Sequence, residues 1–245
     1  MLTEFANPEK FERIARIAGP AATVAALACA ATGLYFGLVA SPPDYQQGDT
    51  VRIMYVHVPA AWLALFAYVF IAGASVVGFA WKHPLADVAA KSAAPIGAVF
   101  TALALITGSI WGKPMWGAWW AWDARLTSML ILFFLYLGYI AVWEAFEDKG
   151  RAARIAAIVA TVGVVNVPII HFSVDHWSSL HQKASVFRSD GPTIDPAMLT
   201  PLLIMAAAYM AGFVGLLIAS MRNEIAARRL ARIEAARPVS EVLLQ

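Results

Sequence analysis

The sequence predicts an all-α, polytopic integral membrane protein with six transmembrane helices and both termini in the cytoplasm. Hydrophobic residues make up 60% of the 245 positions and charged residues only 14%, with a mean hydropathy of +0.66. A soluble domain has about 45–50% apolar and about 25% charged residues. The apolar residues are gathered into six long runs, and most Lys and Arg residues lie on one side of them.

The chain is expected to form a single membrane domain over residues 1–245. The polar segments between the runs are too short for a separate soluble domain of about 100–150 residues. A single cysteine, Cys29, excludes an internal disulfide, a cysteine-based zinc site and a cysteine-ligated iron–sulfur cluster. The net charge of +2 gives no indication of a nucleic-acid partner.

The six runs each have the length of a membrane-spanning helix, because a hydrocarbon core of about 30 Å needs roughly 20 apolar residues. They cover residues 17–40, 58–80, 89–111, 126–146, 155–172 and 198–221. In the third run, Lys91 and Pro95 are expected near the helix start, where lysine reaches the interface and proline is tolerated. The runs are too long and too evenly apolar for strands of a membrane barrel.

The basic residues predict the orientation of these spans. Thirteen of the 18 Lys and Arg residues fall on the side that holds both termini. Because cytoplasmic loops carry the excess of basic residues, that side is predicted to be the cytoplasm. The loops at about 41–57, 112–125 and 173–197 then face outward, to the periplasm in a bacterium. The tail at about 222–245 is expected to continue the sixth helix into the cytoplasm.

Five of the nine tryptophans fall within twelve residues of the second outward loop: Trp111, Trp116, Trp119, Trp120 and Trp122. An interfacial aromatic belt is one interpretation. A belt does not require Gly112, Pro114 and Gly117, which shape the loop between the tryptophans. The alternative is a broad, rigid apolar surface edged by indole N–H groups, which suits a large planar ligand.

Four of the five histidines lie on the outward side: His57, His171, His176 and His181. A single histidine at a helix end is commonly a cap or an ordinary polar residue. Four histidines on the same side of the membrane as the clustered tryptophans favour a ligand role. Neutral imidazole binds iron, and two imidazoles from separate loops could hold a haem.

Charged residues on the same face could complete such a site. Haem propionates need cationic partners, and four basic residues are placed to serve: Arg52, Arg125, Lys183 and Arg188. Each of these could instead anchor to lipid headgroups. Asp123 precedes the fourth run, where it is expected to cap the helix; a hydrogen bond to a ligating histidine is the alternative.

The stretch Trp116…Trp119-Trp120-Ala121-Trp122-Asp123 resembles the tryptophan-rich WWD signature of haem-handling proteins in cytochrome c biogenesis. Together with the segments at 52–62 and 171–182, it makes the chain similar to the CcmC family, haem exporter protein C. The resemblance covers the six spans and all three outward loops. It implies a protein of the bacterial inner membrane that transiently binds haem b and presents it at the periplasmic face.

By motif, the resemblance implies that His57 and His181 are the axial ligands of the haem iron. The other residues of the implied haem site are Trp116, Trp119, Trp120, Trp122, Asp123, Arg52 and Arg125. The implied partners are the haem chaperone CcmE, which receives the haem, the ABC components CcmA and CcmB, the small membrane protein CcmD, and the lipid bilayer. Histidine at position 176 stands where an aromatic residue is expected, so the choice of His181 over His176 or His171 stays open here. Lysine at position 183 stands where glycine is expected and adds a positive charge near the implied propionates.

Other functions are less consistent with the sequence. An enzyme needs a poised acid, base or nucleophile, and the spans offer little beyond Asn166 and Pro168, which a kink or an interhelical hydrogen bond explains. No catalysis is therefore expected. A haem permease needs polar residues along a path through the membrane, and the six runs contain almost none. A WWD-type haem lyase is typically longer than 245 residues. A quinone-linked cytochrome b holds haem with histidines inside its spans, and no run here has an interior pair of histidines.

Overall fold

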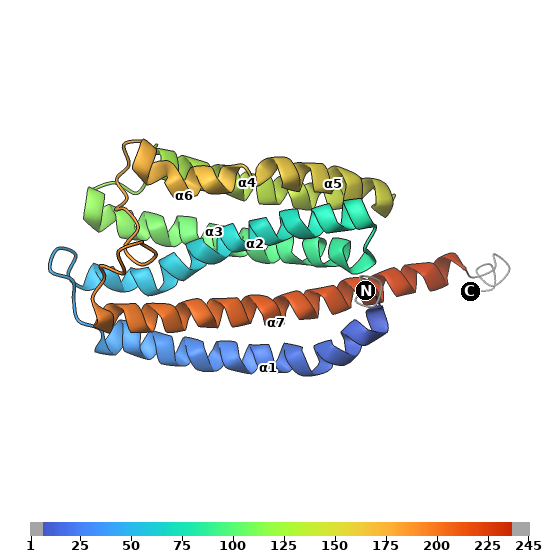
Figure 1. Ribbon diagram of the computed structural model, residues 1–245, viewed down its shortest axis with the longest axis horizontal. Helices are drawn as coiled ribbons and strands as arrows, with labels where there is room; N and C mark the ends of the chain where they lie inside the picture. Colours follow the sequence, from blue (N-terminus) through green and yellow to red (C-terminus); the bar gives the residue numbers. More distant parts are fainter. Residues whose placement is uncertain (1–6, 237–245) are drawn as a thin grey trace.

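The computed structural model describes residues 7–236, which form one elongated bundle of helices aligned along a common axis (Figure 1). The elements in chain order are α1 (Pro8–Tyr35), η2 (Phe36–Ala40), η3 (Asp49–Ile53), α2 (Met54–Trp81), α3 (Pro84–Trp116), α4 (Ala124–Ala145), α5 (Lys149–Gly163), α6 (Asn166–His176) and α7 (Pro196–Ala235). No β-strand occurs between residues 7 and 236; Asp44 and Gly48 form one isolated bridge.

Within residues 7–236, six helical segments are long and apolar enough to cross a membrane, which confirms the predicted all-α fold with six spans: Pro8–Ala40, Asp49–Trp81, Pro84–Trp116, Ala124–Ala145, Lys149–His176 and Pro196–Ala235. The helices extend beyond the apolar runs at most ends. Residues 49–57, 112–116 and 173–176, which the sequence assigned to outward loops, are therefore helical. Hydropathy marks the thickness of the apolar layer, whereas a helix continues through polar residues until a cap or breaker ends it.

The start of the third span also differs from the expectation. Because α3 begins at Pro84, Pro95 lies well inside the helix instead of in its first turn. Lys91 forms an ion pair with Glu224 of α7, with 2.7 Å between its Nζ and the carboxylate oxygen. The lysine therefore ties α3 to α7.

The fifth span is interrupted between α5 and α6, at residues 164–165. Pro168 has no N–H to offer the carbonyl of Val164, and its ring crowds that carbonyl, so the helix breaks there. Asn166 lies at the break and donates from its side-chain amide to the carbonyl of Ser128 in α4, at 2.8 Å. Both explanations expected for these residues, a kink and an interhelical hydrogen bond, are confirmed.

The packed interior lies among α2, α3, α4 and α5, where small alanines predominate and buried tyrosines lie among them. Tyr136 is fully buried, and its hydroxyl donates to the carbonyl of Ala64 at 2.7 Å. Its ring lies directly on Gly97, where a Cβ atom would be only 2.3 Å from the ring. Tyr68 packs edge-on against Tyr136, with 5.0 Å between ring centroids. Glycine on α3 thus lets α4 approach closely.

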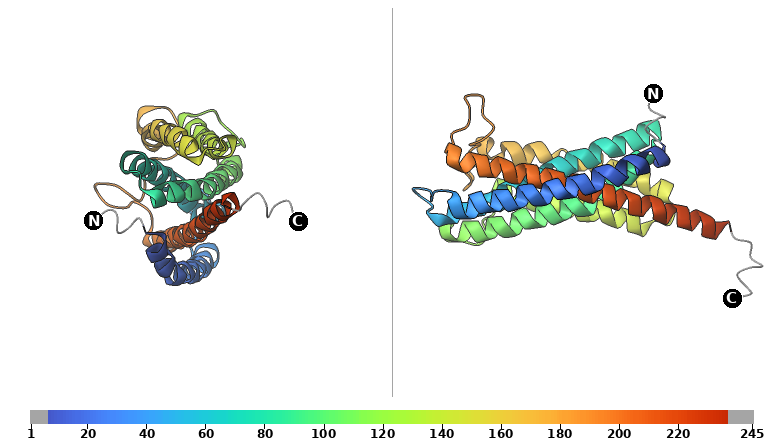
Figure 2. Two further views of the ribbon diagram at one scale, coloured as in Figure 1. Left: turned by 90° about the vertical axis from the view of Figure 1, so that its right-hand side faces the viewer. Right: turned by 90° about the horizontal axis from the view of Figure 1, so that it is seen from below.

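The helix order brings the loops at 41–48, 117–123 and 177–195 to one end of the bundle, at the left of Figure 1. The start of α1 lies toward the opposite end, and the last turns of α7 project beyond the other helices (Figure 2). The predicted helical continuation of the sixth span is confirmed as far as Ala235, and residues 237–245 of the predicted tail lie outside the described part.

We expect a compartment reporter inserted in residues 117–123 and one fused to the C-terminus to report opposite sides of the membrane. The loops and the last turns of α7 lie at opposite ends of the bundle. The excess of Lys and Arg on the side of the termini sets the direction. Cysteine labelling from outside intact cells provides an independent check. The same compartment at both positions would contradict the six-span topology.

Candidate functional site

A cavity of about 370 Å³ opens among the loops at this end of the bundle. It is bounded by the first turns of α2, the last turns of α3, the start of α4 and the loop at 177–195. His57 and His181 both line it, although they are 124 positions apart in the sequence. Its walls are mostly apolar and include Trp62, Trp111 and Trp116. The cavity therefore combines two imidazoles with the aromatic surface that the sequence predicts.

His57 lies in the first turn of α2, not in the preceding loop. Its Nδ1 is 3.1 Å from the hydroxyl oxygen of Thr107 on α3. The imidazole packs edge-on against the indole of Trp111, with 5.7 Å between ring centroids. A rigid helix therefore carries this histidine, and two residues of the neighbouring helix fix its ring.

His181 is held differently, because it lies in the irregular segment between α6 and α7. Its Nδ1 is 3.5 Å from Oδ2 of Asp123, and its ring packs against Trp116 with 4.9 Å between centroids. A carboxylate can only accept, so the proton of this contact lies on Nδ1 and leaves the lone pair of Nε2 free.

Asp123 joins two parts of the site with its two oxygens. Oδ1 accepts from the N–H of Leu126 at 2.7 Å and caps α4, as expected from the sequence. Oδ2 accepts from the hydroxyl of Ser179 at 2.7 Å and from the N–H of Leu180 at 3.1 Å, besides its contact with His181. The cap is therefore confirmed and a contact with a histidine is present, and the carboxylate fixes the segment that carries His181 to the start of α4.

The electrostatics of this pair favour a neutral imidazole beside a carboxylate. Burial is the main influence on His181 and brings its pKa below the usual value, although Asp123 opposes this shift. Burial alone would raise the pKa of Asp123, but the hydrogen bonds from Leu126, Ser179 and Leu180, together with His181, hold it below its usual value. Neutral imidazole is the form that binds metals.

The five clustered tryptophans divide into two groups. Trp111, Trp116 and Trp120 line the cavity. Trp119 and Trp122 do not, and 58% and 78% of their surfaces are exposed. The indole Nε1 of Trp120 is buried without a hydrogen-bond partner among the described residues. This N–H is a donor that a ligand in the cavity could satisfy.

The outward basic residues likewise fall into those that line the cavity and those that do not. Arg125 and Lys183 line the cavity, and Arg125 donates to the carbonyl of His171 at 3.4 Å. Arg188 does not line the cavity; it is paired with Asp190 at 2.6 Å, and Lys183 itself is paired with Asp175 at 3.9 Å.

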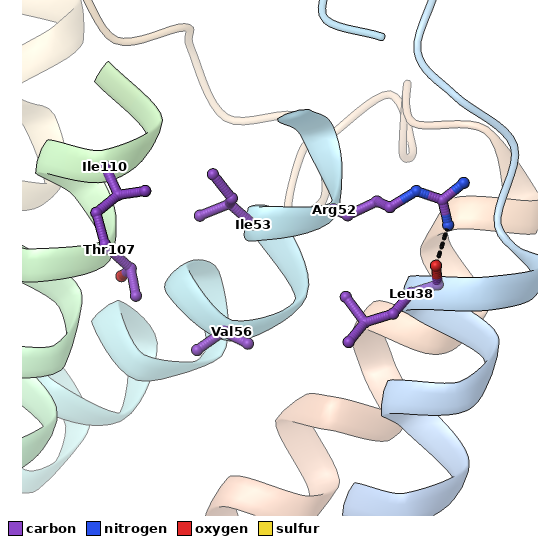
Figure 3. A pocket seen from close by; sticks show the side chains of 6 residues that line it. All are labelled: Leu38, Arg52, Ile53, Val56, Thr107 and Ile110. Atoms are coloured by element: carbon purple, nitrogen blue, oxygen red, sulfur yellow. Dashed lines mark hydrogen bonds between the residues drawn. The ribbon is translucent and has the colours of Figure 1, made fainter. Parts of the chain in front are cut away.

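Arg52 is not brought to the cavity. It lines a separate crevice, where it points away from Thr107 and Ile110 toward the carbonyl of Leu38 (Figure 3). It also contacts the carbonyl of Gly37 at 3.5 Å and pairs with Asp49 at 3.0 Å. The last carbonyls of a helix lack partners within the helix and attract cations, which explains this position at the end of η2.

The two histidines that were alternatives to His181 are placed differently. His171 lines the cavity, and its ring packs against Phe172. His176 does not line the cavity; it is exposed, and its Nδ1 lies 3.1 Å from the carbonyl of Phe172. The geometry therefore favours His181, which has a carboxylate partner, over both.

Several residues that line the cavity were not singled out from the sequence. Gln47 accepts from the indole N–H of Trp111 at 2.9 Å, so the first loop reaches the cavity. Trp62 packs against Phe187, with 5.1 Å between centroids. Trp62 lies four residues after Val58, which also lines the cavity, so the helical period places these two residues on the same face. No comparable signal marks Gln47 or Phe187, because irregular loops bring them in.

Taken together, the fold and the cavity define a multi-pass membrane protein with an aromatic site at one end of its bundle. The family model described as "Heme exporter protein C", CcmC, matches residues 1–236. A protein named Heme exporter protein C from Bradyrhizobium diazoefficiens is 53% identical over 233 residues, covering 95% of this chain and 88% of that protein. One of the same name from Escherichia coli K12 is 44% identical, covering all of this chain and 97% of that protein. The chain belongs to the CcmC family.

Proposed function

We propose that the protein binds haem b in the cavity at the outward, periplasmic face of the bacterial inner membrane and delivers it to the haem chaperone CcmE. The single observation that carries the proposal is the convergence of His57 and His181 on one aromatic-walled cavity. The family name, which describes the relatives as haem exporters, agrees with it. In this account CcmA, CcmB and CcmD are partners in the same membrane.

The residues around the cavity fit a haem. Porphyrin is flat and apolar, and the indoles of Trp111, Trp116 and Trp120 supply the surface to cover it. The N–H of Trp120, which has no hydrogen-bond partner within residues 7–236, and the cationic groups of Arg125 and Lys183 suit carboxylate groups at a porphyrin edge. His57 and His181 would ligate the iron through Nε2.

The placement of the two histidines suits a protein that passes its ligand on. His57 is fixed on a helix, whereas His181 lies in a segment without regular structure between α6 and α7. Opening that segment would uncover one side of the cavity and leave the bundle intact. The interior among α2, α3, α4 and α5 is filled by buried alanines, other apolar residues and tyrosines, so the described structure favours binding at the end of the bundle over passage through it.

Delivery to the chaperone is tested in cells that lack their own CcmC but contain the other Ccm components. With the wild-type chain, we expect haem to accumulate on CcmE, measured by haem staining of the purified chaperone. The double variant His57→Gly, His181→Gly should give none, while His176→Gly should match the wild type. Normal loading of CcmE by the double variant would contradict the proposed delivery.

We expect Trp120→Ala to weaken haem retention more than Trp119→Ala. Trp120 lines the cavity, whereas Trp119 is exposed and its carbonyl accepts from the hydroxyl of Ser109 at 2.7 Å. Loss of one aromatic contact corresponds to about 1–3 kcal/mol, or roughly 5- to 150-fold in affinity. The haem that remains should keep its low-spin spectrum, because both histidines are intact. Equal effects of the two substitutions on haem content would contradict this division of the tryptophans.

A further inference from the structure

Thr107 of α3 connects His57 to the backbone of a neighbouring helix. Its hydroxyl oxygen lies 2.6 Å from the carbonyl oxygen of Leu103 and 3.3 Å from that of Ala104, one turn earlier in α3. The same oxygen lies 3.1 Å from Nδ1 of His57. Three groups of the protein thus share one hydroxyl.

The direction of each hydrogen bond follows from the number of protons. A threonine hydroxyl has one proton and two lone pairs, and a backbone carbonyl can only accept. The hydroxyl proton is directed to the carbonyl of Leu103, at the shortest of the three distances. The contact with His57 is then a hydrogen bond only if Nδ1 carries the proton. In this tautomer the lone pair lies on Nε2.

Gly108, the next residue of α3, makes room for the same ring. A Cβ atom at this position would be 2.9 Å from Cε1 of His57 and 3.5 Å from its Nδ1. Such a distance requires the imidazole to move away. Thr107 therefore holds the ring by its Nδ1 edge, and Gly108 lets it lie against α3.

We propose that Thr107 is a positioning residue that holds His57 in the Nδ1–H tautomer, with Nε2 available to ligate iron, and that Gly108 provides the space for this orientation. The inference rests on the proposed haem-binding function. It gives the two ligands different partners: His57 donates to a neutral hydroxyl, and His181 to the carboxylate of Asp123. Outer partners of this kind orient ligands and adjust their basicity.

If Thr107 only stabilised its own helix, its replacement should have the same effect as replacing another threonine of α3. Threonine in a helix commonly donates to the carbonyl four residues earlier. Thr101, on the same helix, does so with Gly97 at 2.7 Å, and within residues 7–236 its hydroxyl has no hydrogen bond with a histidine. Thr101→Val and Thr107→Val therefore remove the same kind of helix hydrogen bond, but only the second removes a partner of His57.

The test compares Thr107→Val, Thr107→Ser and Thr101→Val in the purified full-length protein titrated with haem b. Haem affinity is measured optically, and the g-values in electron paramagnetic resonance report the axial ligands. Loss of an outer partner lowers metal affinity about 10- to 100-fold. We expect a decrease in this range with altered g-values for Thr107→Val, near-wild-type behaviour for Thr107→Ser, and no change for Thr101→Val. Gly108→Ala should also alter the g-values.

A double-mutant comparison separates an effect through His57 from a general one. In the His57→Gly background, Thr107→Val should cause no further loss of haem affinity, because its partner is already absent. Wild-type affinity and g-values in Thr107→Val, or the same loss in Thr101→Val, would overturn the inference. Both outcomes leave the proposed function standing if the wild type shows a low-spin spectrum with two histidine ligands. A wild type without that spectrum would instead refute the proposed haem site.

Discussion

Replacement of His57 or His181 by glycine is expected to abolish the low-spin haem spectrum of the purified protein. Each substitution removes one of the two imidazoles that line the cavity, and the loss should exceed the 10- to 100-fold cost of removing an outer partner. Glycine leaves space where each imidazole was. Added imidazole should therefore enter that space and restore the spectrum, measured by optical titration.

The other two outward histidines serve as controls for this experiment. His176→Gly should have no effect, because His176 is exposed and does not line the cavity. His171→Gly should retain the low-spin spectrum, although His171 lines the cavity and its carbonyl accepts from Arg125. Imidazole-dependent recovery at position 171 or 176, with no effect at 181, would show that His181 is assigned wrongly.

Asp123→Asn is expected to lower haem affinity about 10- to 100-fold while the protein stays folded. Asparagine can still cap α4 through its side-chain oxygen, because asparagine and aspartate are similarly good caps. Its amide group cannot accept from the N–H of Leu180 or from Nδ1 of His181, both of which now contact the carboxylate. The substitution therefore separates the anchoring of His181 from the capping of α4.

Two further variants complete that experiment. Asp123→Ala should show the same loss of haem and, in addition, lower stability by about 1 kcal/mol, because the cap is removed as well. Asp148 caps α5 through its contacts with the N–H groups of Gly150 and Arg151, and Asp148→Ala should lower stability without changing haem affinity. Wild-type haem affinity in Asp123→Asn would refute the role of its carboxylate in positioning His181.

Much of the fold could be predicted from hydropathy and a few local signals. Six apolar runs give six spans because the length of a membrane helix is set by the bilayer. Pro168 and Asn166 mark the break in the fifth span. Proline lacks the N–H that would continue the helix hydrogen bonds, and a polar side-chain amide inside a membrane needs a hydrogen-bond partner. Asp123 could be recognised as a cap from its position before an apolar run.

The direction of individual side chains could not be predicted in the same way. Trp119 and Trp120 are adjacent, yet only Trp120 lines the cavity, because the course of an irregular loop decides which side each faces. Arg52 lies close in sequence to His57 but turns to the carbonyls at the end of η2. The sequence contains no pairing signal between Thr107 and His57, which become neighbours only when α2 and α3 pack.

The most direct test of the account is the spectrum of the purified wild-type protein with one equivalent of haem b. Optical absorption and electron paramagnetic resonance distinguish two histidine ligands from one histidine and from haem held without iron ligation. The account predicts a low-spin spectrum with two histidine ligands, contributed by His57 and His181. A high-spin spectrum, or a low-spin spectrum that persists when both histidines are replaced, would contradict it.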